Sequence, residues 1–165
     1  MHLQKEILIN APASSVWEVL GSNYTRVGDW ASVINESAPR NNHRGELEGR
    51  TCESTYGSVK EMITQYDEKA HLLSYQADGL PAMFREGGST WQVMPVDSNK
   101  ARVIMDLKMK LAPLPGLLMG WMIKVKMSKD TDQLMLDLKH FVETGEPTDA
   151  KVKSDEKFTK KRARK

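Results

Sequence analysis

The spacing of hydrophobic and polar residues predicts the first elements of the chain. Residues 2–10 alternate loosely and are rich in Ile and Leu, which predicts a β-strand. Residues 11–20 follow, with Pro12 at a position that suits a first helical turn. Apolar residues recur at helical spacing in that segment and again over residues 26–34. We therefore expect two short helices after the first strand.

The middle of the chain, residues 36–111, has the pattern of an antiparallel sheet. Short β-prone runs are separated by turn-forming sequences such as NNHRG, ADGLP and VDSNKA. This spacing favours a meander of about six strands. The clearest strand is 102–111, in which the apolar residues on one face are Val103, Met105, Leu107, Met109 and Leu111. Charged residues occupy the other face, so the sheet is predicted to have one dry and one wet face.

The remainder of the chain is predicted to form a long helix. Residues 130–145 carry an amphipathic pattern, and Gly145 stands where a helix should end. Upstream, residues 111–123 contain no charge. That stretch is shorter than the roughly 20 apolar residues needed to span a bilayer. We expect its prolines, in residues 112–116, to form the crossing into a helix that begins near Gly116. The apolar first turns can then line a cavity mouth or meet a partner, a membrane surface or a lid.

Charge is distributed unevenly along the chain. The sequence has 24 Lys and Arg against 22 Asp and Glu, but residues 146–165 alone hold eight basic and four acidic residues. The body of the protein therefore has no basic excess for a nucleic-acid backbone, and we expect no specific nucleic-acid partner. The tail has little to bury, so we expect one domain over residues 1–145 and a disordered basic tail over 146–165. A weak contact of the tail with nucleic acid or an anionic surface is the alternative.

The cysteine and histidine content limits the disulfides and metal sites that the protein can form. A single cysteine, Cys52, excludes an internal disulfide, and residues 1–20 show no secretory signal. Both observations favour a cytoplasmic protein, and we expect Cys52 to be buried and inert. The four histidines are too scattered to predict a zinc site. No phosphate-binding loop or nucleophile elbow is present, so we expect neither a metal nor a cofactor.

Several segments, taken in order over residues 3–145, resemble the START/Bet v 1-like (SRPBCC) superfamily, in particular its polyketide cyclase/dehydrase and lipid-transport branch. INAPASSVWEVL resembles the junction of the first strand and helix, and GDW the tryptophan of the second helix. GSVKEMITQYDEKAHLLSYQADGLP, which contains Glu61, Asp67 and Tyr75, resembles the central hairpin. DLKHFVETG resembles the end of the long helix.

This resemblance implies an α+β helix-grip fold. In that fold a curved antiparallel sheet wraps around a long C-terminal helix, and two short helices after the first strand close one end. A cavity between sheet and helix usually holds an apolar small molecule. The sequence departs from the family in EGRTCES, where Arg50 directly follows Gly49 in place of a Gly-x-x-Arg-like pattern. We therefore assign Arg50 no ligand role.

On this fold we expect the ligand cavity to be lined mainly by apolar side chains. Tryptophan and methionine supply large, adaptable contact surfaces. A tyrosine hydroxyl can bond a carbonyl or hydroxyl of the ligand. The predicted ligand-binding residues are Trp30, Tyr75, Trp91, Met105, Leu107, Met109, Leu118 and Met122. Plain core packing is the alternative role for each of them.

Two polar residues, Glu61 and His71, are the candidates for a catalytic role. In one register of the hairpin Glu61 faces inward with Ile63, and a carboxylate among apolar side chains can act as an acid or base. In the other register Met62 faces inward instead. A surface or cross-strand ion pair is the other role we expect for Glu61.

These expectations leave two functional hypotheses. The first is a non-catalytic binder or carrier of a lipid, polyketide-like or aromatic molecule. The second is a cyclase or dehydratase that acts on a polyketide-like or aromatic substrate in the same cavity, which requires at least two convergent polar groups. The sequence gives no indication of the oligomeric state.

Overall fold

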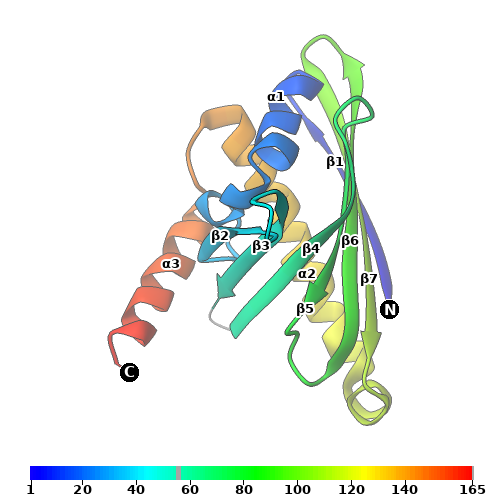
Figure 1. Ribbon diagram of the computed structural model, residues 1–165, viewed down its shortest axis with the longest axis vertical. Coiled ribbons are helices and arrows are strands. Elements are labelled where there is room, and N and C mark those ends of the chain that lie inside the picture. Colours follow the sequence, from blue (N-terminus) through cyan, green and yellow to red (C-terminus); the bar gives the residue numbers. More distant parts are fainter. Residues whose placement is uncertain (55–56, 165) are drawn as a thin grey trace.

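A single curved antiparallel sheet forms the frame of the computed structural model (Figure 1). The structure describes residues 1–54 and 57–164, with the backbone alone for 114–118, and within these residues seven strands pair in the order β1-β7-β6-β5-β4-β3-β2. The strands are β1 (His2–Ile9), β2 (Glu36–Asn41), β3 (Leu47–Ser54), β4 (Gly57–Asp67), β5 (Leu72–Asp78), β6 (Phe84–Asp97) and β7 (Lys100–Leu111). Six of them fall within residues 36–111, which confirms the predicted meander.

Short helical turns follow β1. The α-helix α1 (Ala13–Trp17) continues into the π-helical turn η1 (Glu18–Ser22), and the 3₁₀-helix η2 (Tyr24–Asp29) follows. The second helix is therefore shorter than predicted from residues 26–34 and begins earlier. The buried side chains of Val27 and Trp30 are three residues apart, a spacing that places them on one face of a 3₁₀ turn.

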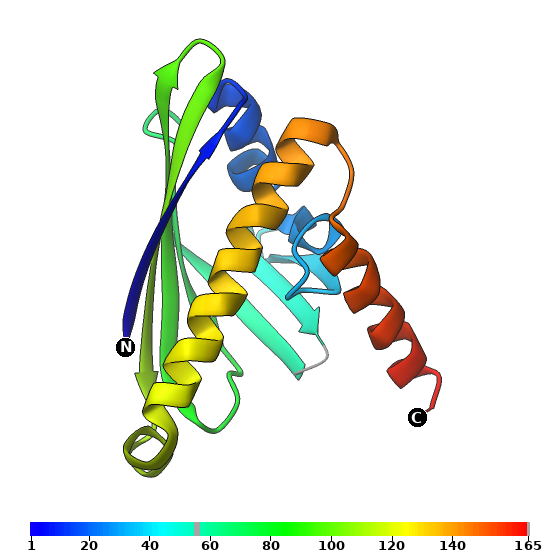
Figure 2. The ribbon, with the colours of Figure 1, turned by 180° about the vertical axis from the view of Figure 1, so that it is seen from behind.

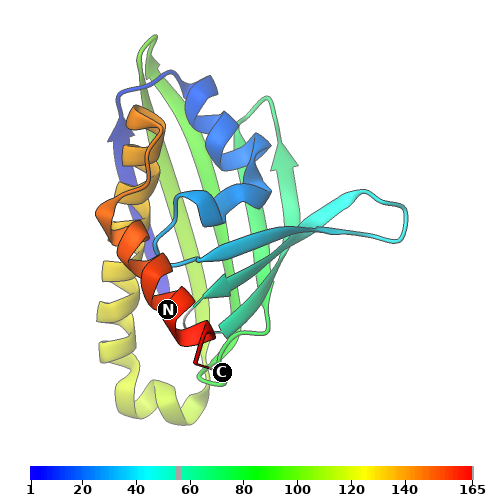
Figure 3. The same cartoon turned by 90° about the vertical axis from the view of Figure 1, so that its left-hand side faces the viewer.

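The long helix α2 (Pro113–Thr144) crosses the concave face of the sheet (Figures 2 and 3). It begins at Pro113, earlier than the predicted start near Gly116, because proline at a first helical position keeps a favourable φ and lacks only an N–H that would be unpaired there. It ends at Gly145, whose φ of 77° forms the left-handed cap. That end was predicted correctly.

The core lies between the sheet and the helices. On β7 the side chains of Val103, Met105 and Met109 are buried, whereas Lys108 and Lys110 on the opposite face are exposed. The prediction of one dry and one wet face is thus confirmed. Together with the position of α2, this arrangement is the helix-grip architecture expected from the resemblance.

The prediction of a disordered tail over residues 146–165 is wrong. A helix, α3 (Asp149–Arg162), follows α2 and is capped by the Thr148 hydroxyl, which accepts a hydrogen bond from the backbone N–H of Lys151. The Lys151 side chain is almost fully buried, and its Nζ donates to the Ile34 carbonyl at 2.7 Å. The tail folds because the aliphatic stem of Lys151 is buried while its ammonium group donates hydrogen bonds. Amino-acid composition alone does not reveal this contact.

Candidate ligand-binding site

An internal cavity of about 70 Å³ lies between the sheet and the helices. Apolar side chains from η1, η2, residues 30–34, β5, β6 and α2 form most of its wall. Four polar residues complete the wall, namely Tyr24, Arg50, Glu61 and Tyr75, and we call them the polar cluster. The site therefore combines an apolar lining with one polar corner, which is the usual composition of a small-molecule site.

A buried ion pair is the centre of the polar cluster. Arg50 on β3 and Glu61 on β4 occupy directly opposed positions, and Arg50 Nε donates to Glu61 Oε2 at 2.6 Å. Both residues are almost inaccessible to solvent. Arg50 also donates through Nη1 to the backbone carbonyl of Tyr24. The hairpin therefore adopts the register with Glu61 inward, and Glu61 forms the cross-strand ion pair that was one of its expected roles.

Aromatic rings surround the guanidinium. Its Cζ lies 3.9 Å from the centroid of the Tyr24 ring and 5.4 Å from that of the Tyr75 ring, distances at which a cation is attracted to a ring face. The Tyr24 hydroxyl donates to Glu61 Oε2 at 3.3 Å. The indole N–H of Trp91 donates to the Tyr75 hydroxyl at 3.4 Å. The Arg50 guanidinium on β3 is thus in contact with residues of η2, β4 and β5.

The protonation states follow from burial. Burial raises the pKa of the Tyr24 and Tyr75 hydroxyls above their usual range. Burial acts to lower the pKa of Arg50, but the neighbouring acidic groups, with the Glu61 carboxylate first and then Tyr75, Tyr24 and Cys52, together outweigh burial and raise the pKa. Burial likewise raises the pKa of the Cys52 thiol to about 12. At neutral pH the cluster presents protonated hydroxyls and a charged guanidinium, and Cys52 is a buried neutral thiol as predicted.

Three of the predicted ligand-binding residues line the cavity, Trp30, Tyr75 and Trp91. The others lie elsewhere. Met105 is in the hydrophobic core, Leu107 packs against that core, Met109 is buried farther along β7, and Met122 is about half exposed on α2. The side chain of Leu118 lies outside the described residues. The structure therefore brings together the aromatic part of the predicted set.

The two catalytic candidates are not brought together. Glu61 lines the cavity, whereas His71 lies at the turn between β4 and β5 and is not part of its wall. There His71 adopts a φ of 47° and stacks on the Trp17 ring at 5.3 Å between ring centroids. The polar groups that do converge with Glu61 are Arg50 and the two tyrosines.

Sequence reasoning missed Tyr24 and Arg50. Tyr24 lies in the GSNY segment that interrupts the two helical patterns. Arg50 directly follows Gly49, a spacing that departs from the family pattern, so the resemblance predicts no ligand role for it. A signal was present, because Arg50 and Cys52 are two residues apart on one strand and therefore share a face. An arginine on the face of a buried cysteine implies a buried partner for its charge.

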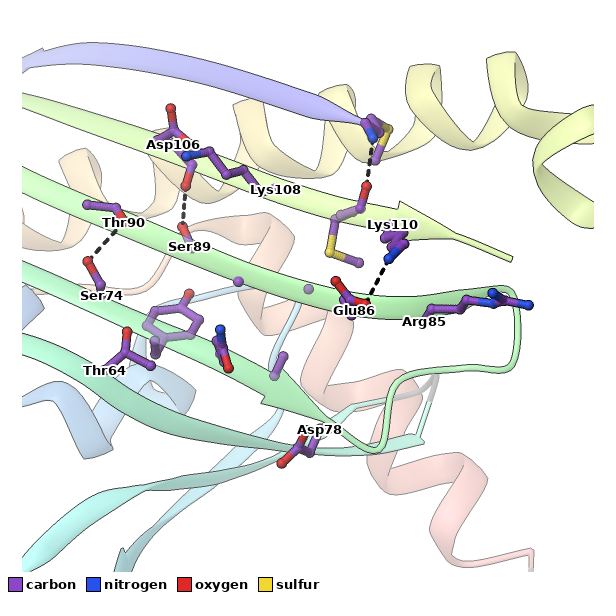
Figure 4. A pocket seen from close by; sticks show the side chains of 17 residues that line it. Thr64, Ser74, Asp78, Arg85, Glu86, Ser89, Thr90, Asp106, Lys108 and Lys110 are labelled. Carbon is purple, nitrogen blue, oxygen red and sulfur yellow. Dashed lines mark hydrogen bonds and ion pairs between the residues drawn. The ribbon is translucent and has the colours of Figure 1, made fainter. Parts of the chain in front are cut away.

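A second, open groove of about 520 Å³ lies on the other face of the sheet (Figure 4). Its polar residues Ser74 and Thr90 are next in sequence to the buried Leu73 and Trp91, so they point away from the core. The Ser74 and Thr90 hydroxyls bond each other at 2.9 Å, and Lys110 pairs with Glu86 at 3.0 Å. These groups satisfy one another, so the internal cavity is the better candidate for an apolar ligand.

Within residues 1–54 and 57–164, no group of three or more His, Cys, Asp or Glu side chains could hold a metal ion.

Comparison with known proteins places the chain in a family. A family model described as polyketide cyclase/dehydrase and lipid transport matches residues 1–143. Similar solved structures include a START superfamily protein from Mycobacterium smegmatis, 16% identical over 86% of this chain and 97% of that one, with a TM-score of 0.68. The Zhui aromatase/cyclase from Streptomyces sp. R1128 is 13% identical over 90% of this chain and 99% of that one, with a TM-score of 0.68.

An uncharacterised protein from Bacillus thuringiensis is 17% identical over 86% of this chain and 98% of its own, with a TM-score of 0.71. No curated protein matches the sequence. At these identities the neighbours establish the fold class, which is START/Bet v 1-like. The chain belongs to the polyketide cyclase/dehydrase and lipid-transport family, because that family's model covers nearly all of it.

Proposed function

We propose that the protein binds a hydrophobic small molecule bearing a hydrogen-bond acceptor, in the space between the sheet and α2. The observation that carries this proposal is the buried Arg50–Glu61 pair at the wall of an apolar cavity. A buried ion pair is often no more stabilising than well-packed apolar residues of similar volume. The position of the Arg50–Glu61 pair beside the cavity is therefore better explained by recognition of a polar group on a ligand than by a contribution to the stability of the fold.

The donor capacity of the polar cluster supports an acceptor on the ligand. A guanidinium has five N–H donors in a fixed plane, and two nitrogens of Arg50 already bond Glu61 and the Tyr24 carbonyl. Trp30 also lines the cavity, and within the described part of the chain its indole nitrogen has no hydrogen-bond partner. A ligand carbonyl, hydroxyl or carboxylate oxygen would accept from such donors.

The volume of the cavity implies that it expands when a ligand binds. Ligand pockets commonly measure about 300–1,000 Å³, and this one measures about 70 Å³. Val33, Ile34 and Leu134 line it and are only partly buried. We expect the wall between residues 33–34 and α2 to open, because these side chains have the least packing to lose.

Native mass spectrometry of gently purified protein tests the proposal, together with uptake of an apolar naphthalene-type fluorescent dye. Val33→Phe should fill the cavity and reduce uptake about tenfold or more, whereas Val96→Phe, at a half-exposed position on β6, should leave it unchanged. Circular dichroism would establish that both variants fold. Absence of a co-purified ligand together with equal dye uptake by both variants would refute the proposal.

A second candidate function, a cyclase or dehydratase, is favoured by one observation. The protonated Tyr75 hydroxyl, which accepts a hydrogen bond from Trp91, and the Arg50 guanidinium converge at the cavity, and such donors can stabilise negative charge that develops on a carbonyl oxygen. Accelerated deuterium exchange at the α-carbon of a bound aromatic ketone, lost in Tyr75→Phe, would support this activity. Binding of the ketone without acceleration would support binding alone.

A further inference from the structure

Residues 119–125 of α2 carry an apolar surface that is open to solvent. Trp121 is 71% exposed, and Met119, Met122 and Val125 are each about half exposed. The other three tryptophans of the chain, Trp17, Trp30 and Trp91, are all at most 3% exposed. A tryptophan that is this accessible contributes little to the core. We therefore expect the role of this side chain to lie outside the fold, at a surface that Trp121 could contact.

These residues form one stripe along the helix. Trp121 and Val125 are four residues apart and Met122 and Val125 are three apart, so their side chains are neighbours. Ile123 and Met127, on the other side of the same turns, are less exposed. We call Met119, Trp121, Met122 and Val125 the α2 stripe.

The stripe belongs to a larger apolar end of the molecule. Met83, in the loop between β5 and β6, is 40% exposed, and its carbonyl accepts a hydrogen bond from the Ala112 N–H at 2.8 Å. Ala112 immediately precedes α2. Figures 1 and 2 show this loop and the start of α2 at the same end of the fold. The stripe and the loop tip therefore lie at one extremity.

The same end carries an excess of lysine. Residues 107–129 contain five lysines, Lys108, Lys110, Lys124, Lys126 and Lys129, and no aspartate or glutamate. Lys124 and Lys129 are exposed beside the stripe. The other three are paired with carboxylates just outside that segment: Lys108 with Asp106, Lys110 with Glu86 and Lys126 with Asp130. Exposed apolar side chains that include a tryptophan are thus bordered by cationic ones.

We propose that this end of the protein docks on an anionic lipid surface. Tryptophan and methionine would enter the headgroup region while the lysines contact lipid phosphates, which is how interfacial helices bind. A second copy of the chain fits less well, because a symmetric contact would place lysines against lysines. Protein interfaces are also depleted in lysine. Within the described residues no helix is long and apolar enough to cross a bilayer.

Trp121 makes the proposal directly testable by tryptophan fluorescence. The other tryptophans are buried, so their emission is a constant background. With vesicles containing phosphatidylglycerol we expect a blue shift of tryptophan emission and co-sedimentation, both decreasing as salt is raised. Vesicles of phosphatidylcholine alone should give a much weaker response. Trp121→Ser should abolish the shift and most sedimentation, whereas Leu136→Ser, at a half-exposed apolar position farther along α2, should bind as wild type.

The charge contribution is tested separately. Lys124→Gln with Lys129→Gln should weaken partitioning onto anionic vesicles by about thirtyfold, from roughly fivefold per lysine. The docking does not depend on the cavity, so Val33→Phe should still bind vesicles even where it loses ligand. No sedimentation of the wild type at low salt, or unchanged binding by Trp121→Ser, would overturn the proposal. Dimerisation that Trp121→Ser abolishes, without vesicle binding, would instead assign the stripe to a second copy.

Discussion

Arg50 Nε on β3 lies 2.6 Å from Glu61 Oε2 on β4, at directly opposed positions of the two strands. The pair is buried and lines the internal cavity. One interaction therefore joins the sheet, the turn that carries Tyr24 and the candidate binding site.

Removal of either partner alone should be strongly destabilising. Arg50→Met leaves the Glu61 carboxylate buried without its cation, and we expect the free energy of unfolding to fall by about 3–5 kcal/mol. The double variant Arg50→Met/Glu61→Leu should recover much of that loss, because no unpaired charge remains. Urea unfolding of the four proteins in a double-mutant cycle measures the coupling. Additive effects of the two substitutions would show that the pair is not coupled.

Gly49 should be indispensable for the close approach of β3 and β4 next to this pair. A Cβ at position 49 would lie 2.0 Å from the Glu61 carbonyl oxygen, so Gly49→Ala must displace the strands. We expect a loss of several kcal/mol in the free energy of unfolding and weaker binding of cavity ligands. Gly120→Ala is the matched control, since the nearest atom to its Cβ is 3.7 Å away and alanine favours a helix by about 1 kcal/mol. Equal stability of the two variants would contradict this account.

Cys52 should make stability fall at alkaline pH. Its folded-state pKa of about 12 is above the ordinary value of 9.0, so the folded protein retains the thiol proton over a range in which the unfolded chain loses it. The contribution is fully present below about pH 9 and is lost as the pH rises towards 12. In Cys52→Ala the free energy of unfolding should decline less steeply between these values, as measured by urea titrations at several pH values. Parallel slopes would contradict the prediction, because the tyrosine hydroxyls titrate in both proteins.

Lys151 should hold α3 against the body of the protein. Its Nζ donates to the Ile34 carbonyl at 2.7 Å and pairs with Asp155 at 2.6 Å. Lys151→Met keeps the packing of the stem but leaves the carbonyl without its donor, which should cost about 1–3 kcal/mol. Hydrogen exchange should then accelerate across α3. Lys153→Met, at an exposed position of the same helix, should change stability by no more than about 0.5 kcal/mol.

The sequence by itself determined the features that depend on local periodicity and chemistry. Alternation along residues 102–111 identified the buried face of β7, because successive side chains of a strand point to opposite sides. Gly145 marked the end of α2, because glycine adopts positive φ at little cost. Tyr75 is two residues from Leu73 on one strand, so the same alternation puts it on the face of Leu73, which is the core face.

The tertiary structure alone decided which polar groups meet. Periodicity could not choose between the two registers of the central hairpin, because a shift of one residue exchanges the two faces. In the structure Glu61 is buried opposite Arg50, which identifies the register with Glu61 inward. The burial of Lys151 depends on carbonyls more than a hundred residues away, so a composition that predicts disorder instead forms α3. The cavity at the polar cluster likewise depends on contacts among distant elements, and no local pattern specifies its volume.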